Sequence, residues 1–146
     1  MLKVLIAVDG SEHASRAIDA VGKMAKSSVE LEATLVSVSP GVVLDPLFYE
    51  GYTTESMRKL QAEQKKQQDS ILASATEQAR ARGIKLAEPV RGAGPIAKEI
   101  LRVAKEQQAD QIAMGTRGLG ALGSMVMGSV AQQVLHHSPV PLLLVR

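Results

Sequence analysis

The sequence contains no cysteine and very few aromatic residues. Without cysteine the chain can form no disulfide bond, no thiolate nucleophile, no cysteine-zinc site and no iron–sulfur cluster. The only aromatic residues are Phe48, Tyr49 and Tyr52, which share one short stretch. A core must therefore be built from aliphatic residues and Met. The stacking platforms that favour binding of single-stranded nucleic acid are scarce.

Charge of one sign and long apolar runs are also scarce. The 146 residues carry 17 Lys and Arg against 15 Asp and Glu, a net charge of +2, and no five like charges follow one another. We therefore expect a solvated surface and no nucleic-acid partner. No apolar stretch reaches the about 18 residues of a membrane span, and the first apolar run lacks the features of a secretory signal. These absences favour a cytoplasmic protein with no membrane partner.

What the sequence does contain is a regular alternation of short apolar runs and helical patterns. Apolar runs typical of buried strands occupy 2–8, 30–38, 84–90, 110–114 and 141–145. Helical patterns follow Ser11, cover 54–82, follow Pro95 and cover 128–137. This order predicts an α/β fold in a single domain over residues 1–146, an open doubly wound five-stranded parallel sheet with helices on both faces. We expect the strand order 3-2-1-4-5.

Turn and capping residues predict several boundaries. Ser11 is the expected N-cap of the first helix, and Gly83 is expected to end the long, mostly solvated second helix. Residues 92–95 are predicted as a turn that opens the third helix, with Pro95 suited to the first helical position. The longest loop, 40–53, holds all three aromatic residues, and we hypothesise that it covers a ligand pocket as a lid.

The glycine-rich segment after the fourth strand is the most informative part of the chain. In open α/β sheets, ligands bind beyond the carboxyl ends of the strands. Five Gly residues occur between Gly115 and Gly128, directly after a strand and directly before a helix. Glycine lets the main chain approach a ligand closely, and a helix N-terminus adds unpaired N–H donors. The segment predicts a phosphate cradle, to which Ser129 adds a hydroxyl and Arg117 a cation; glycines that serve only turns are the alternative.

Other phosphate-binding motifs fit this segment less well. It contains no Lys, so it cannot be a P-loop. The pattern Gly118-x-Gly120-x-x-Gly123 spells a dinucleotide fingerprint, but that motif belongs in the first strand–helix–strand unit and needs an acid further on. The final strand offers none.

No catalytic residue and no metal ligand is predicted. The sequence has no Gly-x-Ser-x-Gly elbow, and Asp9, Ser11 and His13 lie too close together in sequence for a catalytic triad. The adjacent His136 and His137 point apart on a helix, so they make a poor metal pair, and they suit the last turn of a helix electrostatically.

The spacing Gly115-x2-Gly118-x9-Gly128-Ser129 resembles the signature of the ATP-binding branch of the universal stress protein family. The likeness extends over the whole chain, and its other parts are residues 6–11, 92–95, 109–115 and 138–145. The resemblance implies an ATP-binding protein that acts as a stress-response sensor or signalling module. The second strand ends in Ser37-Val38 where the family often has His-Val, a departure that leaves the predicted site undisturbed.

The resemblance also implies roles for individual residues. Asp9 would contact the nucleotide near its adenine end, and Val38 would contact adenine through its main chain. Each has a structural alternative: Asp9 as an acid in a helix-start turn and Val38 as a core residue. Ser129 could instead cap the last helix. The full predicted set of ATP-binding residues is Ala7, Asp9, Val38, Met114, Gly115, Arg117, Gly118, Gly128, Ser129 and Val130.

Partners and cofactors follow from the same resemblance. The family commonly forms homodimers through the last strand, here Leu142 to Val145. Mg²⁺ or Mn²⁺ would be held mostly by the phosphates and water, because the sequence offers no carboxylate cluster. Three alternatives stay open: a slow ATPase, a binder of AMP or a cyclic nucleotide, and a structural dimer with an empty pocket.

Overall fold

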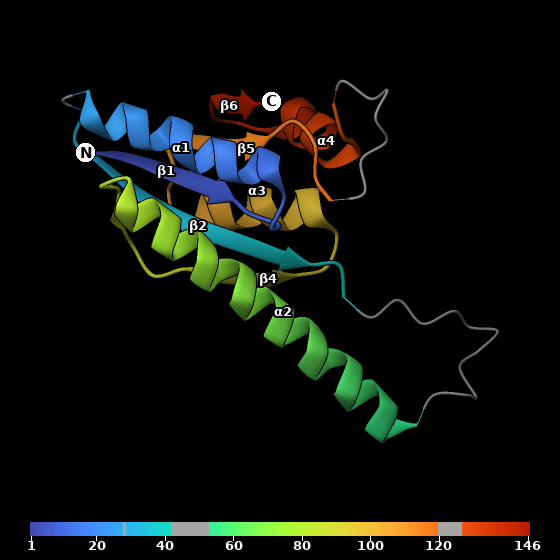
Figure 1. The fold of residues 1–146 in the computed structure, drawn as a ribbon. Helices are drawn as coiled ribbons and strands as arrows, with labels where there is room; N and C mark the ends of the chain where they lie inside the picture. Colours follow the sequence, from blue (N-terminus) through green and yellow to red (C-terminus); the bar gives the residue numbers. More distant parts are fainter. Residues whose placement is uncertain (28, 42–52, 120–126) are drawn as a thin grey trace.

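The computed structural model describes residues 1–27, 29–41, 53–119 and 127–146 (Figure 1). The helices and strands are β1 Leu2–Ala7, α1 Glu12–Lys26, β2 Leu31–Ser39, α2 Thr54–Ala81, β3 Lys85–Leu86, β4 Val90–Ala93, α3 Ile96–Glu106, β5 Gln111–Gly115, α4 Ser129–His137 and β6 Leu142–Val145. The described strand pairs are all parallel, in the order β3-β2-β1-β5-β6, with β4 also paired to β2. The α/β class and the relative order of the predicted strands are confirmed.

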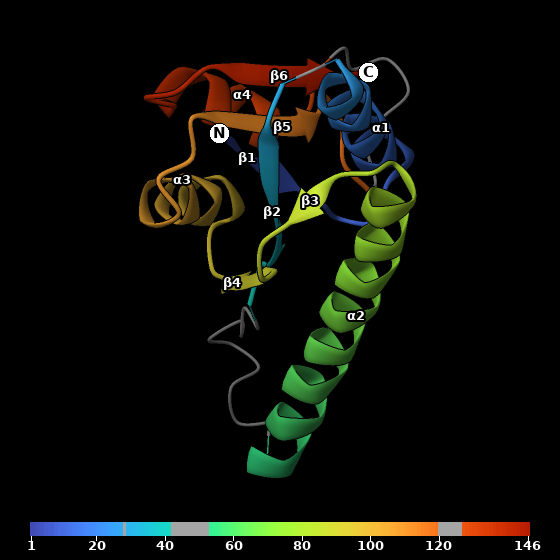
Figure 2. The ribbon, with the colours of Figure 1, turned by 90° about the vertical axis from the view of Figure 1, so that its left-hand side faces the viewer.

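The sheet separates two apolar cores. Helices α1 and α2 cover one face, and α3 and α4 cover the other (Figure 2). Successive side chains of a strand point to opposite faces, so Val4 and Ile6 of β1 pack with the first pair of helices and Leu5 with the second. Each such fully buried aliphatic side chain stabilises the fold by about 1.5–3 kcal/mol. The buried core contains no aromatic residue among those described.

The segment predicted as one strand over 84–90 forms two short strands, so the described sheet has six strands and not five. β3 pairs with the first half of β2 and β4 with the second half. Pro89 stands directly before β4. It has no N–H to donate to a ladder and restricts the residue before it, which explains why the pairing is interrupted there.

The turn predicted at 92–95 is also wrong in its first two positions. The chain stays extended through Ala93, and only Gly94 has a positive φ, 122°. Pro95 is then the N-cap of α3 and not its first helical residue. The strand continues because Gly92 pairs with Val38 of β2.

α2 is long and mostly exposed, as predicted. It ends at Ala81 with Arg82 as C-cap, and Gly83 follows with φ 78°. Its amino-terminal half extends past the sheet (Figure 1). No helix in the described ranges is both long and apolar enough to cross a bilayer. The lid hypothesis falls almost entirely on residues 42–52, which lie outside the described residues, as do residues 120–126 of the glycine-rich segment.

Candidate functional site

A cavity of about 390 Å³ opens at the carboxyl ends of β1, β2 and β5, next to the amino ends of α3 and α4. This volume suits a small organic ligand. Its lining contains all ten residues predicted to bind ATP, namely Ala7, Asp9, Val38, Met114, Gly115, Arg117, Gly118, Gly128, Ser129 and Val130. The structure therefore brings the predicted set together in one place, and their contact with a ligand stays a prediction.

Sequence reasoning missed part of the lining. The further lining residues are Val8, Ala14, Val36, Ile96, Ile100, Thr116, Leu119 and Ala131. Ile96 and Ile100 belong to the helix predicted after Pro95, for which the sequence indicates no ligand contact. The signal that could have placed them was the helix start after Gly94-Pro95, because that helix begins at the same edge of the sheet. Thr116 and Leu119 lie at positions of the glycine signature that can hold any residue, so the spacing predicts nothing about their side chains.

One side of the cavity is apolar. Val36 and Val38 of β2, Met114 of β5, and Ile96 and Ile100 of α3 form this wall, and all five belong to or pack against the core between the sheet and α3 and α4. Such a surface favours a flat, weakly polar group. Val38 therefore packs with the core, as its structural alternative predicts, and also lines the cavity; its contact with adenine stays a prediction.

Another side of the cavity is the start of α4. The N-cap is Gly128, which has no side chain to accept from the helix, so the alternative that Ser129 caps it is wrong. The first bond of the helix runs from the Gln132 N–H to the Gly128 carbonyl at 3.1 Å. The N–H groups of Ser129, Val130 and Ala131 therefore have no partner within the helix. Together with the helix dipole they favour an anion here.

The Gly128 N–H is not one of these free donors. It donates to the Thr116 carbonyl at 2.6 Å. This bond joins the first part of the glycine-rich segment, which follows β5, to its last residue, the N-cap of α4. It therefore fixes where α4 begins. The donors left for an anion are those of the first turn of α4.

The Asp9 carboxylate ties two main-chain segments together. Its Oδ1 accepts from the Ser11 N–H at 2.9 Å, and its Oδ2 accepts from the Leu119 N–H at 3.2 Å. The first bond shapes the turn before α1, where the Ser11 hydroxyl accepts from the Ala14 N–H at 3.2 Å and confirms Ser11 as N-cap. The second bond joins the end of β1 to the glycine-rich segment. Asp9 thus has the helix-start role and also lines the cavity.

Neighbouring protein atoms lie close to Gly115 and Gly118, main-chain atoms of α1 at the first and the Asp9 carboxylate at the second. Neither residue has a positive φ. A Cβ at Gly118 would lie 2.6 Å from Asp9 Oδ2, and a Cβ at Gly115 would lie 2.5 Å from the Cβ of His13. The alternative in which these glycines only serve turns therefore does not apply to them; both permit close packing.

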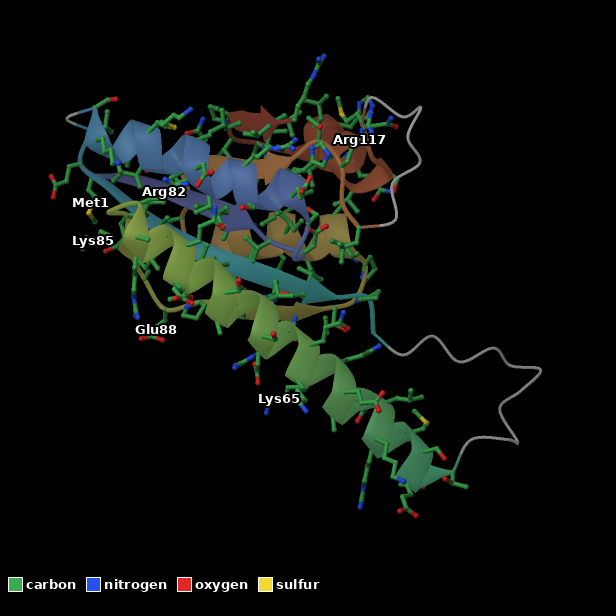
Figure 3. All side chains as sticks on the ribbon, viewed as in Figure 1. Met1, Lys65, Arg82, Lys85, Glu88 and Arg117 are labelled. Carbon is green, nitrogen blue, oxygen red and sulfur yellow. The ribbon has the colours of Figure 1, made fainter. Side chains whose placement is uncertain are left out.

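The charges around the cavity are few. Arg117 lies at the carboxyl end of the sheet, opposite the end where Met1 and Lys85 lie (Figure 3). It forms no ion pair with any carboxylate that the structure describes. Within the described ranges, no three His, Asp or Glu side chains gather as a metal-binding group.

Comparison with known proteins identifies the family. The model of the universal stress protein family matches residues 1–146. The chain belongs to this family. The universal stress protein YxiE of Bacillus subtilis is 35% identical, over 99% of this chain and 98% of the relative. The structure of the hypothetical protein MJ0577 has a TM-score of 0.80 to this chain at 24% identity, over 98% of this chain and 94% of that one.

Several solved structures of the same fold contain adenine nucleotides. A family member from Arabidopsis thaliana with AMP bound has a TM-score of 0.70 at 18% identity, over 99% of this chain and 91% of that one. The protein from Archaeoglobus fulgidus in complex with dAMP has a TM-score of 0.68 at 19% identity, over 100% of this chain and 98% of that one. A universal stress protein in complex with cAMP has a TM-score of 0.66 at 23% identity, over 99% of this chain and 96% of that one. At these identities the likeness to this chain is one of fold.

Proposed function

We propose that the chain binds an adenine nucleotide in this cavity, with ATP as the principal ligand. One observation carries the proposal: the residues predicted from the glycine signature line a single cavity that has an apolar wall on one side and the uncapped start of α4 on another. The adenine nucleotides in structures of the same fold support the ligand class.

The two sides of the cavity suit the two ends of a nucleotide. The base would lie against the apolar wall formed by Val38 and Ile96, where dispersion and the hydrophobic effect favour a flat ring. The phosphates would accept from the first N–H groups of α4, and the Arg117 guanidinium would add a positive charge. Asp9 would repel a phosphate, so it suits the adenosine end, where an amine or hydroxyl can donate to its carboxylate.

A divalent ion is compatible with this arrangement but would owe little to protein side chains. The described residues offer no acidic cluster, so Mg²⁺ or Mn²⁺ would be held mainly by phosphate oxygens and water. Such an ion would neutralise charge on the phosphates.

Nucleotide binding would serve sensing or signalling. The bond from the Leu119 N–H to Asp9 lies at the cavity, so a ligand that competes for the Asp9 carboxylate changes how the glycine-rich segment is held. A ligand can shift a conformational equilibrium only through such differential contacts. We further propose that the chain works as a homodimer through β6, and we expect it in the cytoplasm.

Two measurements test the proposed function. Mass spectrometry of molecules released on denaturing the purified protein identifies a retained nucleotide, and calorimetry with ATP, AMP and cAMP ranks the ligands. We expect ATP to bind most tightly. Tighter binding of AMP or cAMP would keep the adenine site and overturn the preference for ATP. Absence of heat with all three at millimolar concentration, with no nucleotide released, would overturn the proposal.

A further inference from the structure

α2 is attached to the sheet by a buried side-chain amide as well as by apolar contacts. Gln68 is 8% exposed and lies among the buried residues of the helix. Its Nε2 donates to two main-chain carbonyls, that of Ser37 in β2 at 2.6 Å and that of Gly92 in β4 at 2.9 Å. A single amide therefore holds two neighbouring strands at their carboxyl ends.

Such support matters for β4 because it is a short strand. It consists of only four residues, Val90–Ala93, and Pro89 interrupts the ladder before it. Among the described residues, β4 pairs with β2 alone. Replacing Gln68 by an apolar residue removes one accepted hydrogen bond from each of these two carbonyls, and with it the link from α2 to both strands.

The position of β4 decides where Val38 lies. Val38 pairs with Gly92 in the register of β2 and β4. A Cβ at Gly92 would lie only 3.2 Å from Val38 Cγ2, so the valine side chain rests directly on the glycine. Ser37 faces α2 and Val38 faces the cavity, since neighbouring residues of a strand point to opposite faces. Gln68 thus acts on the cavity wall from the opposite face of the sheet.

A second side chain holds β4 from the α3 side. The Glu99 carboxylate accepts from the Arg102 guanidinium at 2.9 Å, and this bond, with a smaller contribution from the main chain of Ala93, holds the pKa of Glu99 below its ordinary value. Its side chain is 16% exposed. β4 is therefore held from both faces: Gln68 and, through its ion pair with Arg91, Asp69 act from the α2 side, and Glu99 lies against Gly92 from the α3 side. Of these contacts, only that of Gln68 reaches β2 as well.

We propose that Gln68 is a positioning residue that fixes the pairing of β2 with β4 and, through Gly92 and Val38, the apolar wall of the cavity. The expected effect of Gln68 on ligand binding rests on the proposed function, whereas its effect on the pairing of β2 with β4 does not. Gln68 is assigned to the base end of the site and not to the phosphate end, because the hydrogen bonds that the structure describes for Gln68 go to β2 and β4 and not to the start of α4.

The test compares Gln68→Leu with Gln78→Leu. Gln78 lies on the same helix and also donates from Nε2 to two acceptors, the Ser15 carbonyl at 2.9 Å and Asp19 Oδ1 at 3.0 Å, but these belong to α1. Calorimetry uses adenosine as the base-end probe and tripolyphosphate as the phosphate-end probe. We expect Gln68→Leu to weaken adenosine binding about tenfold and to leave tripolyphosphate binding unchanged. Gln78→Leu should leave both unchanged.

Hydrogen exchange supplies a readout that needs no ligand. The Gly94 N–H donates to the Ser39 carbonyl at 2.9 Å and reports on the end of the β2–β4 pairing. We expect its exchange to accelerate in Gln68→Leu and not in Gln78→Leu. Should Gln68→Leu fail to fold, Gln68→Met, which keeps an unbranched side chain, takes its place with the same expectations.

The outcomes separate the two proposals. Unchanged adenosine binding and unchanged Gly94 exchange in a folded Gln68 variant would overturn the positioning role. Equal weakening of both probes would also overturn it, because that pattern reports a general loss of structure. If the wild-type protein binds neither probe, the proposed function fails, while the exchange comparison still decides whether Gln68 holds β4.

Discussion

At the scale of single residues, the glycines of the signature have structural duties that differ from one another. Gly118 leaves room for the Asp9 carboxylate, Gly115 leaves room for α1, and Gly128 begins α4. A spacing pattern indicates that glycine is favoured at these positions, but it does not identify the neighbouring atoms that leave no room for a side chain. The phosphate cradle predicted from the pattern therefore depends on helix–strand packing as much as on approach to a ligand.

Gly115→Ala tests the packing duty. The new Cβ would lie 2.8 Å from the carbonyl carbon of His13 and 3.0 Å from the nitrogen of Ala14, and neither main-chain atom can rotate away. We expect the free energy of unfolding to fall by about 1–3 kcal/mol, the range for overpacking, as measured by chemical denaturation. Gly128→Ala is the control, since its nearest contact would be 3.4 Å from the Thr116 oxygen and its φ of −72° suits alanine. Equal losses in both variants would contradict this explanation.

Glu99 makes the stability of the fold depend on pH. Hydrogen bonds from Arg102, with a smaller contribution from the main chain of Ala93, lower its pKa in the folded protein. A lowered folded pKa means that the stabilisation is complete above about pH 5 and disappears as the pH falls through the folded value. We expect Glu99→Gln to be less stable than wild type at pH 7 and to lose less stability on acidification, as followed by denaturation at several pH values.

Glu106→Gln is the matched control for this titration. Glu106 meets the same Arg102 guanidinium, but its side chain is 56% exposed, and ion pairs between exposed groups contribute little. We expect it to change the acid limb of the stability curve less than Glu99→Gln does. The reverse order would show that the contact with Ala93 is unimportant.

At the scale of elements, α4 carries the sharpest test of the phosphate end. Proline is favoured at the first helical position, and Gly128 before it has an extended conformation, with ψ 164°, that a following proline accepts. Ser129→Pro therefore removes the Ser129 N–H and hydroxyl while keeping the helix. Ser129→Ala removes the hydroxyl alone. We expect Ser129→Pro to weaken ATP binding about tenfold or more relative to Ser129→Ala in calorimetry, because a bond to a charged phosphate is lost. Equal affinities would exclude this amide as a phosphate donor.

The elements also show what sequence patterns can and cannot predict. Apolar periodicity located the helices and most strands, because burial on one or both faces leaves a regular trace in the sequence. It missed the division of the third predicted strand into β3 and β4. The hydrogen bonds to β2 stop near Pro89 and resume after it, and the apolar pattern of the sequence does not show such an interruption. It could not find the role of Gln68, since this residue is one of several glutamines on a polar helix. Only the structure shows that its side chain meets the carbonyls of two strands.

At the scale of the whole molecule, the site lies where the fold predicts one. The chain extends the sheet in one direction from β1 to β2 and in the other from β1 to β5, so the strand order reverses beside β1. Crevices at such switch points are the usual ligand sites of open α/β sheets. Topology therefore predicts Asp9, Val38 and the glycine-rich segment as neighbours, and the family resemblance supplies the full set of ten residues, whereas the wall contributed by α3 required the structure.

The proposed homodimer can be tested through the exposed side of β6. Ile112 donates to the Pro141 carbonyl and Thr116 to the Val145 carbonyl, so by alternation the main-chain groups of Leu144 face away from β5. Leu144→Pro removes an outward N–H without removing a bond to β5, and edge strands tolerate proline.

We expect wild-type protein to be dimeric and Leu144→Pro to be monomeric by light scattering at the same concentration. Leu144→Ala is the control, because it also removes the leucine side chain but keeps the N–H, and it should remain dimeric. A monomeric alanine variant would show that side-chain packing and not strand pairing holds the subunits together. A dimeric proline variant would place the interface elsewhere, because an unpaired edge strand joins two copies only if its outward amides are free to donate.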